Sequence, residues 1–284
     1  MAEPRSVVVT GTSTGIGRAT VSVLVEAGFH VIPTVRSAAG RDGLVAEFGD
    51  AVTPLLMDLL DDDSVRAMGA EVCARGPLFG LVNNAGAAVP GPLEYLPIEA
   101  FRRQLAINLT GQLLVTQVLL PALRQSAEQI GDARIVMIGS IGGRIAAPIL
   151  GAYAASKHGL VGLTGSLRAE LASSGIKVLL VEPGSIATPI WARGGAAGAE
   201  LQAGRPEIRE RYGPQLDAAA KMSQRGSDSG LDPRVPAEVI RRCLTAAHPI
   251  PRQVVGREAK IIAAMVRVLP YRVMSRLLSG RGRS

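Results

Sequence analysis

The stretch "VVVTGTSTGIG", residues 7–17, decides the fold of this chain. It joins a run of β-branched residues to a glycine-rich turn, and "RATVSVLVEAG" (18–28) then has helical spacing and ends in glycine. Glycine permits unusual backbone dihedrals and close approach of a ligand, and the helix would aim its first amides at the turn, which favours a pyrophosphate. A plain strand-to-helix turn is the alternative interpretation. The stretch predicts a strand, a turn and a helix at the start of a nucleotide-binding α/β domain.

Strands and helices alternate along most of the remaining chain. We expect further strands at 30–35, 51–57, 78–84, 133–140, 176–183 and 252–256, and helices at 41–48, 62–75, 98–125, 153–173 and 236–247. Such alternation implies parallel strands joined by right-handed crossovers, with helices on both faces of one sheet. The pattern predicts an α/β fold, a single doubly wound (Rossmann) parallel sheet of about seven strands, over residues 1–256.

Two segments depart from this alternation. Residues 184–232 are rich in Gly, Ala, Ser and charged residues and are too long for an ordinary connection, so we expect a lid over a site. Residues 257–284 predict a basic C-terminal extension of two amphipathic helical pieces separated at Pro270, and they carry most of the net charge of +7. Four roles are open for this extension: packing against its own domain, capping the site, contacting a partner subunit, or peripheral contact with an anionic membrane.

Composition excludes several classes of protein. The chain is 47% hydrophobic and 19% charged, which is enough apolar material for a core. We expect a cytoplasmic protein, because the apolar runs fall short of the roughly 20 residues that span a bilayer and the N-terminus lacks signal-peptide anatomy. Cys73 and Cys243 lack the spacing of a metal site. Nucleic-acid binding is not expected either, because basic residues concentrate in the extension and stacking aromatics are few.

The stretch "AYAASKHG" (152–159) predicts proton chemistry. Tyr153 and Lys157 are four residues apart, on one face of the expected helix. A free tyrosine titrates near pH 10, and a neighbouring ammonium favours the phenolate and should lower that pKa. Ser140 ends an expected strand, at the edge where doubly wound folds bind ligands. A surface helix pair and a turn serine are the alternatives for these residues.

Together the motifs resemble those of one family. The GxxxGxG spacing of Gly11, Gly15 and Gly17, "NNAG" (83–86), Ser140 and "YAASK" (153–157) resemble the short-chain dehydrogenase/reductase family over about residues 5–256. The resemblance implies an NAD(P)-dependent oxidoreductase that interconverts a ketone or aldehyde and an alcohol.

The resemblance also implies roles for particular residues. In the catalytic set, Ser140 would hold the substrate oxygen, Tyr153 would transfer its proton, Lys157 would support Tyr153 and bind the nicotinamide ribose, and Asn108 would hold a water at an irregular helix turn. Asp58 as a mere strand-end residue and Thr188 as the N-cap of a lid helix are alternatives. The cofactor contacts that the family pattern implies are Gly11, Ser13, Thr14, Gly15, Ile16, Gly17, Asp58, Leu59, Asn84, Ala85, Gly86, Tyr153, Lys157, Pro183, Gly184, Ile186 and Thr188.

The end of the second strand favours NADP(H) over NAD(H). The strand ends "PTVRS", with Val35 where relatives that prefer NAD commonly carry Asp, followed by Arg36 and Ser37. An arginine offers a charged fork to the 2′-phosphate of NADP, whereas an acidic residue would repel it. A solvated surface arginine is the alternative interpretation of Arg36.

Apolar residues around the expected site predict a lipophilic substrate that is steroid-like, retinoid-like or long-chain. Two rival functions stay open: a reductase of 3-oxoacyl thioesters on a carrier protein, and a non-catalytic NADP-binding regulator, which the intact catalytic set disfavours. The resemblance further implies a homodimer or homotetramer built on the helices of Asn108 and Tyr153. The expected substrate walls are Val89, Ile145, Ala146, Ile149, Leu150, Ile190 and Trp191.

Overall fold

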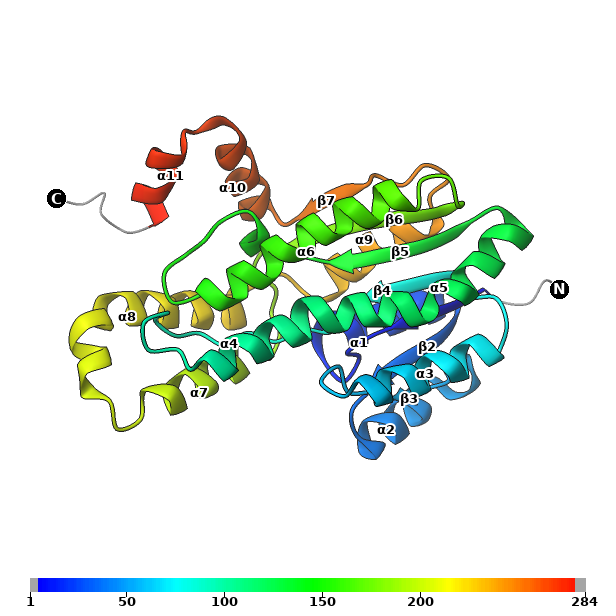
Figure 1. The fold of residues 1–284 in the computed structure, drawn as a ribbon, viewed down its shortest axis with the longest axis horizontal. Coiled ribbons are helices and arrows are strands. Elements are labelled where there is room, and N and C mark those ends of the chain that lie inside the picture. Colours follow the sequence, from blue (N-terminus) through cyan, green and yellow to red (C-terminus); the bar gives the residue numbers. More distant parts are fainter. Residues whose placement is uncertain (1–4, 279–284) are drawn as a thin grey trace.

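Seven parallel strands form one sheet in the order β3-β2-β1-β4-β5-β6-β7 in the computed structural model, which describes residues 5–278 except the side chains of residues 201 and 202 (Figure 1). The order reverses between β1 and β4, and a doubly wound sheet opens a ligand crevice at such a point. The strands are β1 (Ser6–Val9), β2 (His30–Val35), β3 (Leu55–Leu56), β4 (Gly80–Asn83), β5 (Ala133–Ile138), β6 (Ile176–Pro183) and β7 (Arg252–Val255).

Helices cover both faces of this sheet, as the alternation predicted. Val8 of β1 packs into a core with α3 (Asp62–Ala74), α5 (Gly111–Ile130) and α6 (Gly151–Glu170). Val7 and Val9 point the other way, into a core with α1 (Gly15–Glu26), α2 (Ala38–Phe48) and α9 (Arg234–Thr245). Successive side chains of a strand face opposite sides, so a strand covered on both faces must be apolar throughout. The doubly wound α/β fold is confirmed.

The edge strand β3 is shorter than the predicted strand 51–57. A 3-10 turn occupies Gly49–Ala51, and Pro54 has no backbone N–H to donate. Regular pairing with β2 is therefore limited to two residues, with an isolated bridge between Val52 and Val31 before them. The neighbouring helix α2 starts three residues earlier than predicted, because the Ser37 hydroxyl caps it by accepting a hydrogen bond from Gly40 N at 3.2 Å.

The long helix predicted at 98–125 is interrupted and extends further. It consists of α4 (Ile98–Leu105), a π-helical turn (Ala106–Thr110) and α5. By length and composition alone Ile98–Ile130 could cross a membrane, with a mean hydropathy of 1.4. It lies along the sheet in Figure 1, however, and Leu119 and Leu123 are fully buried in the core; core helices pass the same test of length and hydropathy.

The predicted lid region contains two helices, α7 (Ile190–Gln202) and α8 (Pro206–Ser229). They lie beyond the carboxyl ends of the strands, beside α4 (Figure 1). Ile208 and Leu216 of α8 are buried in a small cluster with Ile149. The lid is thus packed on the loop that precedes α6, and a 3-10 turn (Ile141–Gly143) begins that loop.

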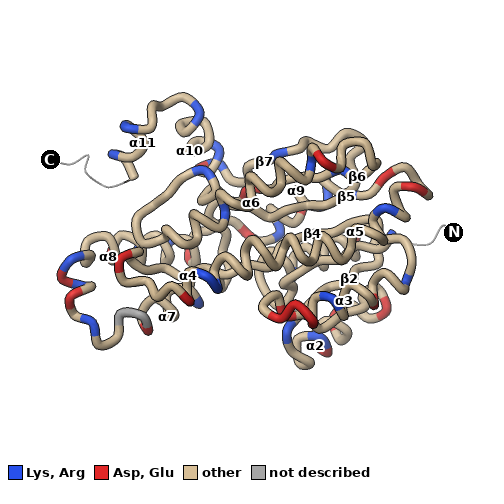
Figure 2. Tube along the Cα trace, in the orientation of Figure 1, with Lys and Arg blue, Asp and Glu red and all other residues tan. Residues whose placement is uncertain are grey.

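The C-terminal extension forms α10 (Arg257–Val268) and α11 (Tyr271–Leu278), separated at Pro270 as predicted. Figure 1 shows both helices standing out from the domain, and Figure 2 shows basic residues along them. In the described part of these helices only Ala259 and Met274 are buried, whereas Val268 and Tyr271 are 78% and 86% exposed. Packing against the domain is therefore slight. Arg281 and Arg283 lie outside the described residues.

Candidate active site

The glycine loop is shaped by contacts that no other residue type allows. Gly11 and Gly15 have φ of +70° and +61°, which strain any residue with a Cβ atom. A Cβ on Gly11 would lie 2.7 Å from the Cα of Ala85, and one on Gly17 would lie 2.3 Å from the Gly11 carbonyl oxygen. The loop therefore lies directly on the turn that follows β4.

The first turn of α1 can bind an anion. Thr14 is its N-cap, but the Thr14 side chain makes no capping hydrogen bond, and the turn holds no acidic residue. Nothing in the first turn thus neutralises the positive end of the helix dipole. Free amides beside a glycine cradle fit a dinucleotide pyrophosphate.

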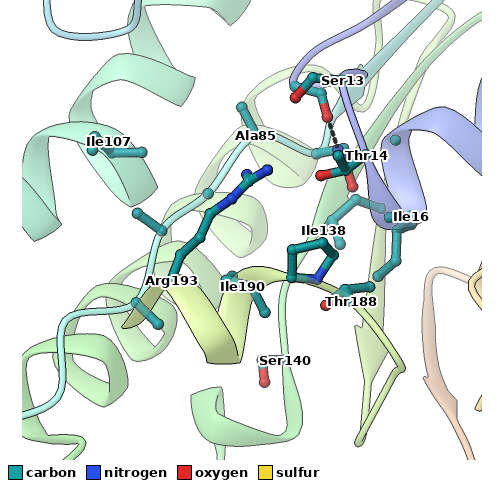
Figure 3. A pocket seen from close by; sticks show the side chains of 18 of the residues that line it. Ser13, Thr14, Ile16, Ala85, Ile107, Ile138, Ser140, Thr188, Ile190 and Arg193 are labelled. Atoms are coloured by element: carbon teal, nitrogen blue, oxygen red, sulfur yellow. Dashed lines mark hydrogen bonds between the residues drawn. The ribbon is translucent and has the colours of Figure 1, made fainter. Parts of the chain in front are cut away.

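A cavity of about 380 Å³ lies between this loop, the carboxyl ends of the strands and the lid (Figure 3). The catalytic candidates Ser140, Tyr153 and Lys157 line it. It is also lined by the predicted cofactor residues Gly11, Ser13, Thr14, Gly15, Ile16, Gly17, Arg36, Asp58, Leu59, Asn84, Ala85, Gly86, Pro183, Gly184, Ile186 and Thr188. The fold thus gathers into one cavity residues that are up to 177 positions apart, from Gly11 to Thr188.

Three predicted contacts have further or different surroundings. Ser37 is not among the residues that line the cavity, and its hydroxyl caps α2. Asp58 lines the cavity, and its carboxylate also accepts a hydrogen bond from Leu60 N at 3.0 Å. Asp58 therefore also stabilises the turn that follows β3. Thr188 does not cap the lid helix, whose N-cap is Pro189, and its methyl group instead faces Gly15.

Tyr153 and Lys157 lie on one face of α6, and both line the cavity. The Lys157 ammonium nitrogen donates a 2.8 Å hydrogen bond to the Ile138 carbonyl and lies 5.9 Å from the centre of the Tyr153 ring. Lys157 is 4% exposed, and this burial lowers its pKa to about 8. Its charge is therefore lost nearer to neutral pH than that of a surface lysine.

The pKa of Tyr153 is raised in the protein alone, whereas the sequence predicts that Lys157 and the positive nicotinamide of the oxidised cofactor together lower it. Burial raises it, because the phenolate loses its water, and a hydrogen bond with Ser140 offsets only part of that rise. Lys157 does not lower it in the protein alone. Tyr153 is therefore protonated at neutral pH, which is the state that a proton donor needs.

Asn108 lies behind the cavity wall, not among its lining residues. It is fully buried in the π-helical turn. The family pattern implies an irregular helix turn at Asn108, and the helix is irregular there. Its side chain bonds both backbone groups of Ala87 and donates to the Ser156 hydroxyl at 3.0 Å. A Cβ on Gly86 would lie 3.4 Å from Asn108 Oδ1 and 3.9 Å from Lys157 Nζ. Asn108 and Lys157 therefore flank Gly86.

Two further amides on the same helical segment hold this loop, and the sequence analysis missed them. Gln104 accepts from Val89 N at 2.8 Å and donates to the Ala87 carbonyl at 2.7 Å. Gln112 donates to the Ala85 carbonyl at 2.7 Å. With Asn108 they form a ladder of fully buried amides spaced four residues apart. That spacing, in an otherwise apolar segment, was the signal that could have identified them.

A buried ion triad, also missed, supports the loop after Ser140. Glu182 at the end of β6 is fully buried and bonds Arg144 and Arg252, with shortest N–O distances of 2.5 and 2.7 Å. Burial alone would raise the pKa of Glu182, but the bonds from Arg252 and Arg144 outweigh it and lower that pKa. The triad ties the Ser140 loop to β6 and β7.

Only some of the residues predicted to form the substrate walls line the cavity. Val89, Ile190 and Trp191 line the cavity, and the Trp191 ring centre lies 5.9 Å from that of Tyr153. Ile145, Ala146, Ile149 and Leu150 do not line it, because the loop turns toward α8, where Ile149 is buried at a φ of 70°. Apolar lining residues that the sequence analysis did not select include Ala88, Ile107, Pro189 and Ala197.

Comparisons with known proteins agree with this geometry. The model of the short chain dehydrogenase family matches residues 5–197. The 3-amino-tetrahydro-pyrrolizinone reductase of Xenorhabdus hominickii is 38% identical over 270 residues, which are 93% of this chain and 91% of the relative. Retinol dehydrogenase 5 of Mus musculus is 33% identical over 291 residues, 95% of this chain and 86% of the relative.

A solved structure supports the same assignment. The structure of a variant of actinorhodin polyketide ketoreductase with NADPH has a TM-score of 0.72 and 28% identity, and the likeness covers 89% of this chain and 96% of the other. The glycine cradle, the Ser140, Tyr153 and Lys157 side chains in one cavity, and these relatives lead to one conclusion. The chain belongs to the short-chain dehydrogenase/reductase family of NAD(P)-binding oxidoreductases.

Proposed function

We propose that this protein is an NADP(H)-dependent enzyme that interconverts a ketone or aldehyde and an alcohol on a lipophilic substrate. The observation that carries the proposal is the placement of Ser140, Tyr153 and Lys157 in the same cavity as the glycine loop. A proton donor, a hydroxyl that can hold the substrate oxygen and a dinucleotide cradle meet there.

The side chains divide the work of carbonyl reduction. When bound, the nicotinamide cofactor supplies a hydride to the carbonyl carbon. Ser140 and Tyr153 hold the carbonyl oxygen, and Tyr153, protonated at neutral pH, donates its proton to that oxygen as negative charge develops there. The Lys157 ammonium then stabilises the phenolate that Tyr153 becomes. Asn108 acts behind them by holding the turn at Gly86 and Ala87.

The preference for NADP(H) rests on Arg36. This residue follows β2 and lines the cavity, and Val35 leaves no carboxylate at the strand end to repel a 2′-phosphate. The likeness to a ketoreductase whose structure was solved with NADPH supports the same preference.

The lipophilic substrate is supported by the apolar side of the cavity around Tyr153. Val89, Ile107, Ile190 and Trp191 line it, and a relative is named a retinol dehydrogenase. Apolar walls with a few polar groups at the reacting atoms are typical of sites for hydrophobic ligands. The likeness to a polyketide ketoreductase favours a 3-oxoacyl thioester on a carrier protein as the second candidate substrate.

A substrate panel separates these candidates. We would follow NADPH absorbance with retinoid aldehydes, steroid ketones, long-chain ketones and 3-oxoacyl thioesters, with Tyr153→Phe as the inactive control. Faster turnover of the free lipophilic carbonyls supports the proposal, and faster turnover of thioesters supports the second candidate. Tight NADPH binding without turnover of any compound would favour the third function, a non-catalytic regulator.

We also propose a homodimer or homotetramer assembled through α5 and α6, the helices of the catalytic side, as the family resemblance implies. Light scattering with mass determination tests it, and a monomer at micromolar concentration would contradict it.

For α10 and α11 we propose peripheral contact with an anionic membrane surface from the cytoplasmic side. Exposed Val268 and Tyr271 stand beside Arg267 and Arg272, an arrangement that suits the boundary between lipid headgroups and acyl chains. Sedimentation with vesicles tests the contact, and equal binding to neutral and anionic phospholipid, or no binding to either, would contradict it.

A further inference from the structure

The lid contributes one cationic side chain to the dinucleotide side of the cavity. Arg193, on the first turn of α7, lines the cavity together with Ser13, Thr14 and Ala85. Figure 3 shows its side chain crossing the cavity from the lid, with the guanidinium end directed toward Ser13 and Thr14. This places it on the glycine-loop side, away from Ser140.

Arg193 is held there by the packing of its own helix. A Cβ on the next residue, Gly194, would lie 2.7 Å from the Ala88 carbonyl oxygen, and one on Gly198 would lie 3.0 Å from the Pro90 carbonyl oxygen. The absence of side chains at both positions lets α7 lie directly on the loop after β4. With this face of the helix fixed, the Arg193 side chain projects over the cleft.

The charges around Arg193 favour the binding of an anion. Within residues 5–278 its guanidinium has no carboxylate partner and no hydrogen bond, whereas several other lid arginines are paired, such as Arg209 with Asp217 and Arg211 with Glu94. It faces the positive end of α1, which also lacks a neutralising side chain. Two positive groups facing each other across a cleft are stabilised by an anion that lies between them.

We propose that Arg193 binds the pyrophosphate of the dinucleotide, so that the lid supplies a direct cofactor contact as well as walls of the substrate site. The proposal rests on the dinucleotide binding of the family and not on the identity of the substrate. Arg36 and Arg193 both line the cavity but would have separate roles, Arg36 toward the 2′-phosphate at the end of β2 and Arg193 toward the pyrophosphate at the glycine loop.

Direct binding measurements with cofactor fragments test this division. Adenosine 2′-monophosphate carries the 2′-phosphate without the pyrophosphate, and 2′-phospho-ADP-ribose carries both. By calorimetry, Arg193→Ala should weaken the binding of 2′-phospho-ADP-ribose about tenfold or more, the usual size for loss of a charge-assisted contact, and leave adenosine 2′-monophosphate unchanged. Arg36→Ala should weaken both fragments.

The matched control is Arg225→Ala, which removes the same charge from an exposed position of the lid that does not line the cavity. It should leave both fragments unchanged. The sole tryptophan, Trp191, lies beside Tyr153 and gives a second readout through quenching of its fluorescence by NADPH.

Three results would overturn the proposal: unchanged binding of 2′-phospho-ADP-ribose to Arg193→Ala, equal weakening of both fragments, or the same loss in Arg225→Ala. Failure of the wild-type protein to bind NADPH would instead contradict the proposed function, so the two failures are distinguishable. Arg193→Lys keeps the charge without the fork and should bind 2′-phospho-ADP-ribose with an affinity between those of the wild type and Arg193→Ala.

Discussion

Asn108 bonds both backbone polar groups of Ala87, accepting from its N–H at 2.9 Å and donating to its carbonyl at 2.9 Å. Gln104 donates to that same carbonyl and also accepts from Val89 N. The loop after β4, which forms a wall of the cavity, is therefore shaped by side chains of the helical segment behind it. The geometry of the site depends on residues that do not touch the reacting atoms.

The first prediction concerns Gln104. Replacing it in Gln104→Leu leaves Val89 N without its acceptor, which should lower the free energy of unfolding by about 1–3 kcal/mol. Because Val89 lines the cavity, KM for the carbonyl substrate should rise more than kcat falls. Urea denaturation and steady-state kinetics check both effects. Gln224→Leu, the same change at an exposed position of α8 that does not line the cavity, is the control, and an equal effect there would contradict a positioning role.

The second prediction concerns the ion triad. Glu182→Gln leaves Arg144 and Arg252 without their shared charge and should destabilise the fold by about 3 kcal/mol, as expected when one partner of a buried pair is removed. It should also lower kcat, because Arg144 is part of the loop that carries Ser140.

The pH dependence of stability distinguishes this role. The pKa of Glu182 is lower in the folded state, so its stabilisation is present above pH 4.5, the ordinary value, and is lost as the pH falls through the folded pKa. Wild type should therefore lose more stability than Glu182→Gln on acidification below pH 4.5. Glu99→Gln, which removes an exposed ion pair with Arg102, should show neither effect.

The third prediction concerns Lys157. Its folded pKa of about 8 lies below the ordinary 10.5, so folding disfavours the charged form below pH 8 and this penalty disappears between pH 8 and 10.5. Lys157→Met should therefore raise the melting temperature at pH 7 while abolishing turnover. Its stability advantage over wild type should shrink as the pH rises from 8 toward 10.5.

Scanning calorimetry at several pH values measures this difference, with Lys221→Met at an exposed lid position as control. A lower melting temperature of Lys157→Met at pH 7 would show that the bond to the Ile138 carbonyl outweighs the burial of the charge.

The fourth prediction concerns the cofactor. The wild type should show the higher kcat/KM with NADPH, and Arg36→Ala should lower that value by about tenfold or more while leaving turnover with NADH nearly unchanged. Steady-state kinetics with both cofactors check this. Equal or better turnover of the wild type with NADH would refute the preference.

The parts of the fold and the site that could be predicted from the sequence are those that depend on interactions between residues close together in the chain. The strand, glycine turn and helix at 7–28 follow from side-chain periodicity and from glycine dihedrals, and the fold agrees there. The four-residue spacing of Tyr153 and Lys157 likewise determined that they share a helix face. The prediction for β3 was less accurate, since the effect of Pro54 depends on pairing at the edge of the sheet.

Contacts between distant segments could not be predicted from the sequence alone. Nothing near Glu182 in the chain indicates that Arg252, 70 residues away, and Arg144 enclose it. The direction of the loop around Ile149, the rise in the pKa of Tyr153 and the reach of Arg193 across the cavity are likewise set by neighbours far apart in the chain. Sequence patterns were enough to identify the family, the sheet and the candidate catalytic side chains, because each of these depends on residues that are close together in the chain. The buried supports of the site, its electrostatics and the packing of the lid became visible only in the folded chain, because burial and charge pairing arise when remote segments meet.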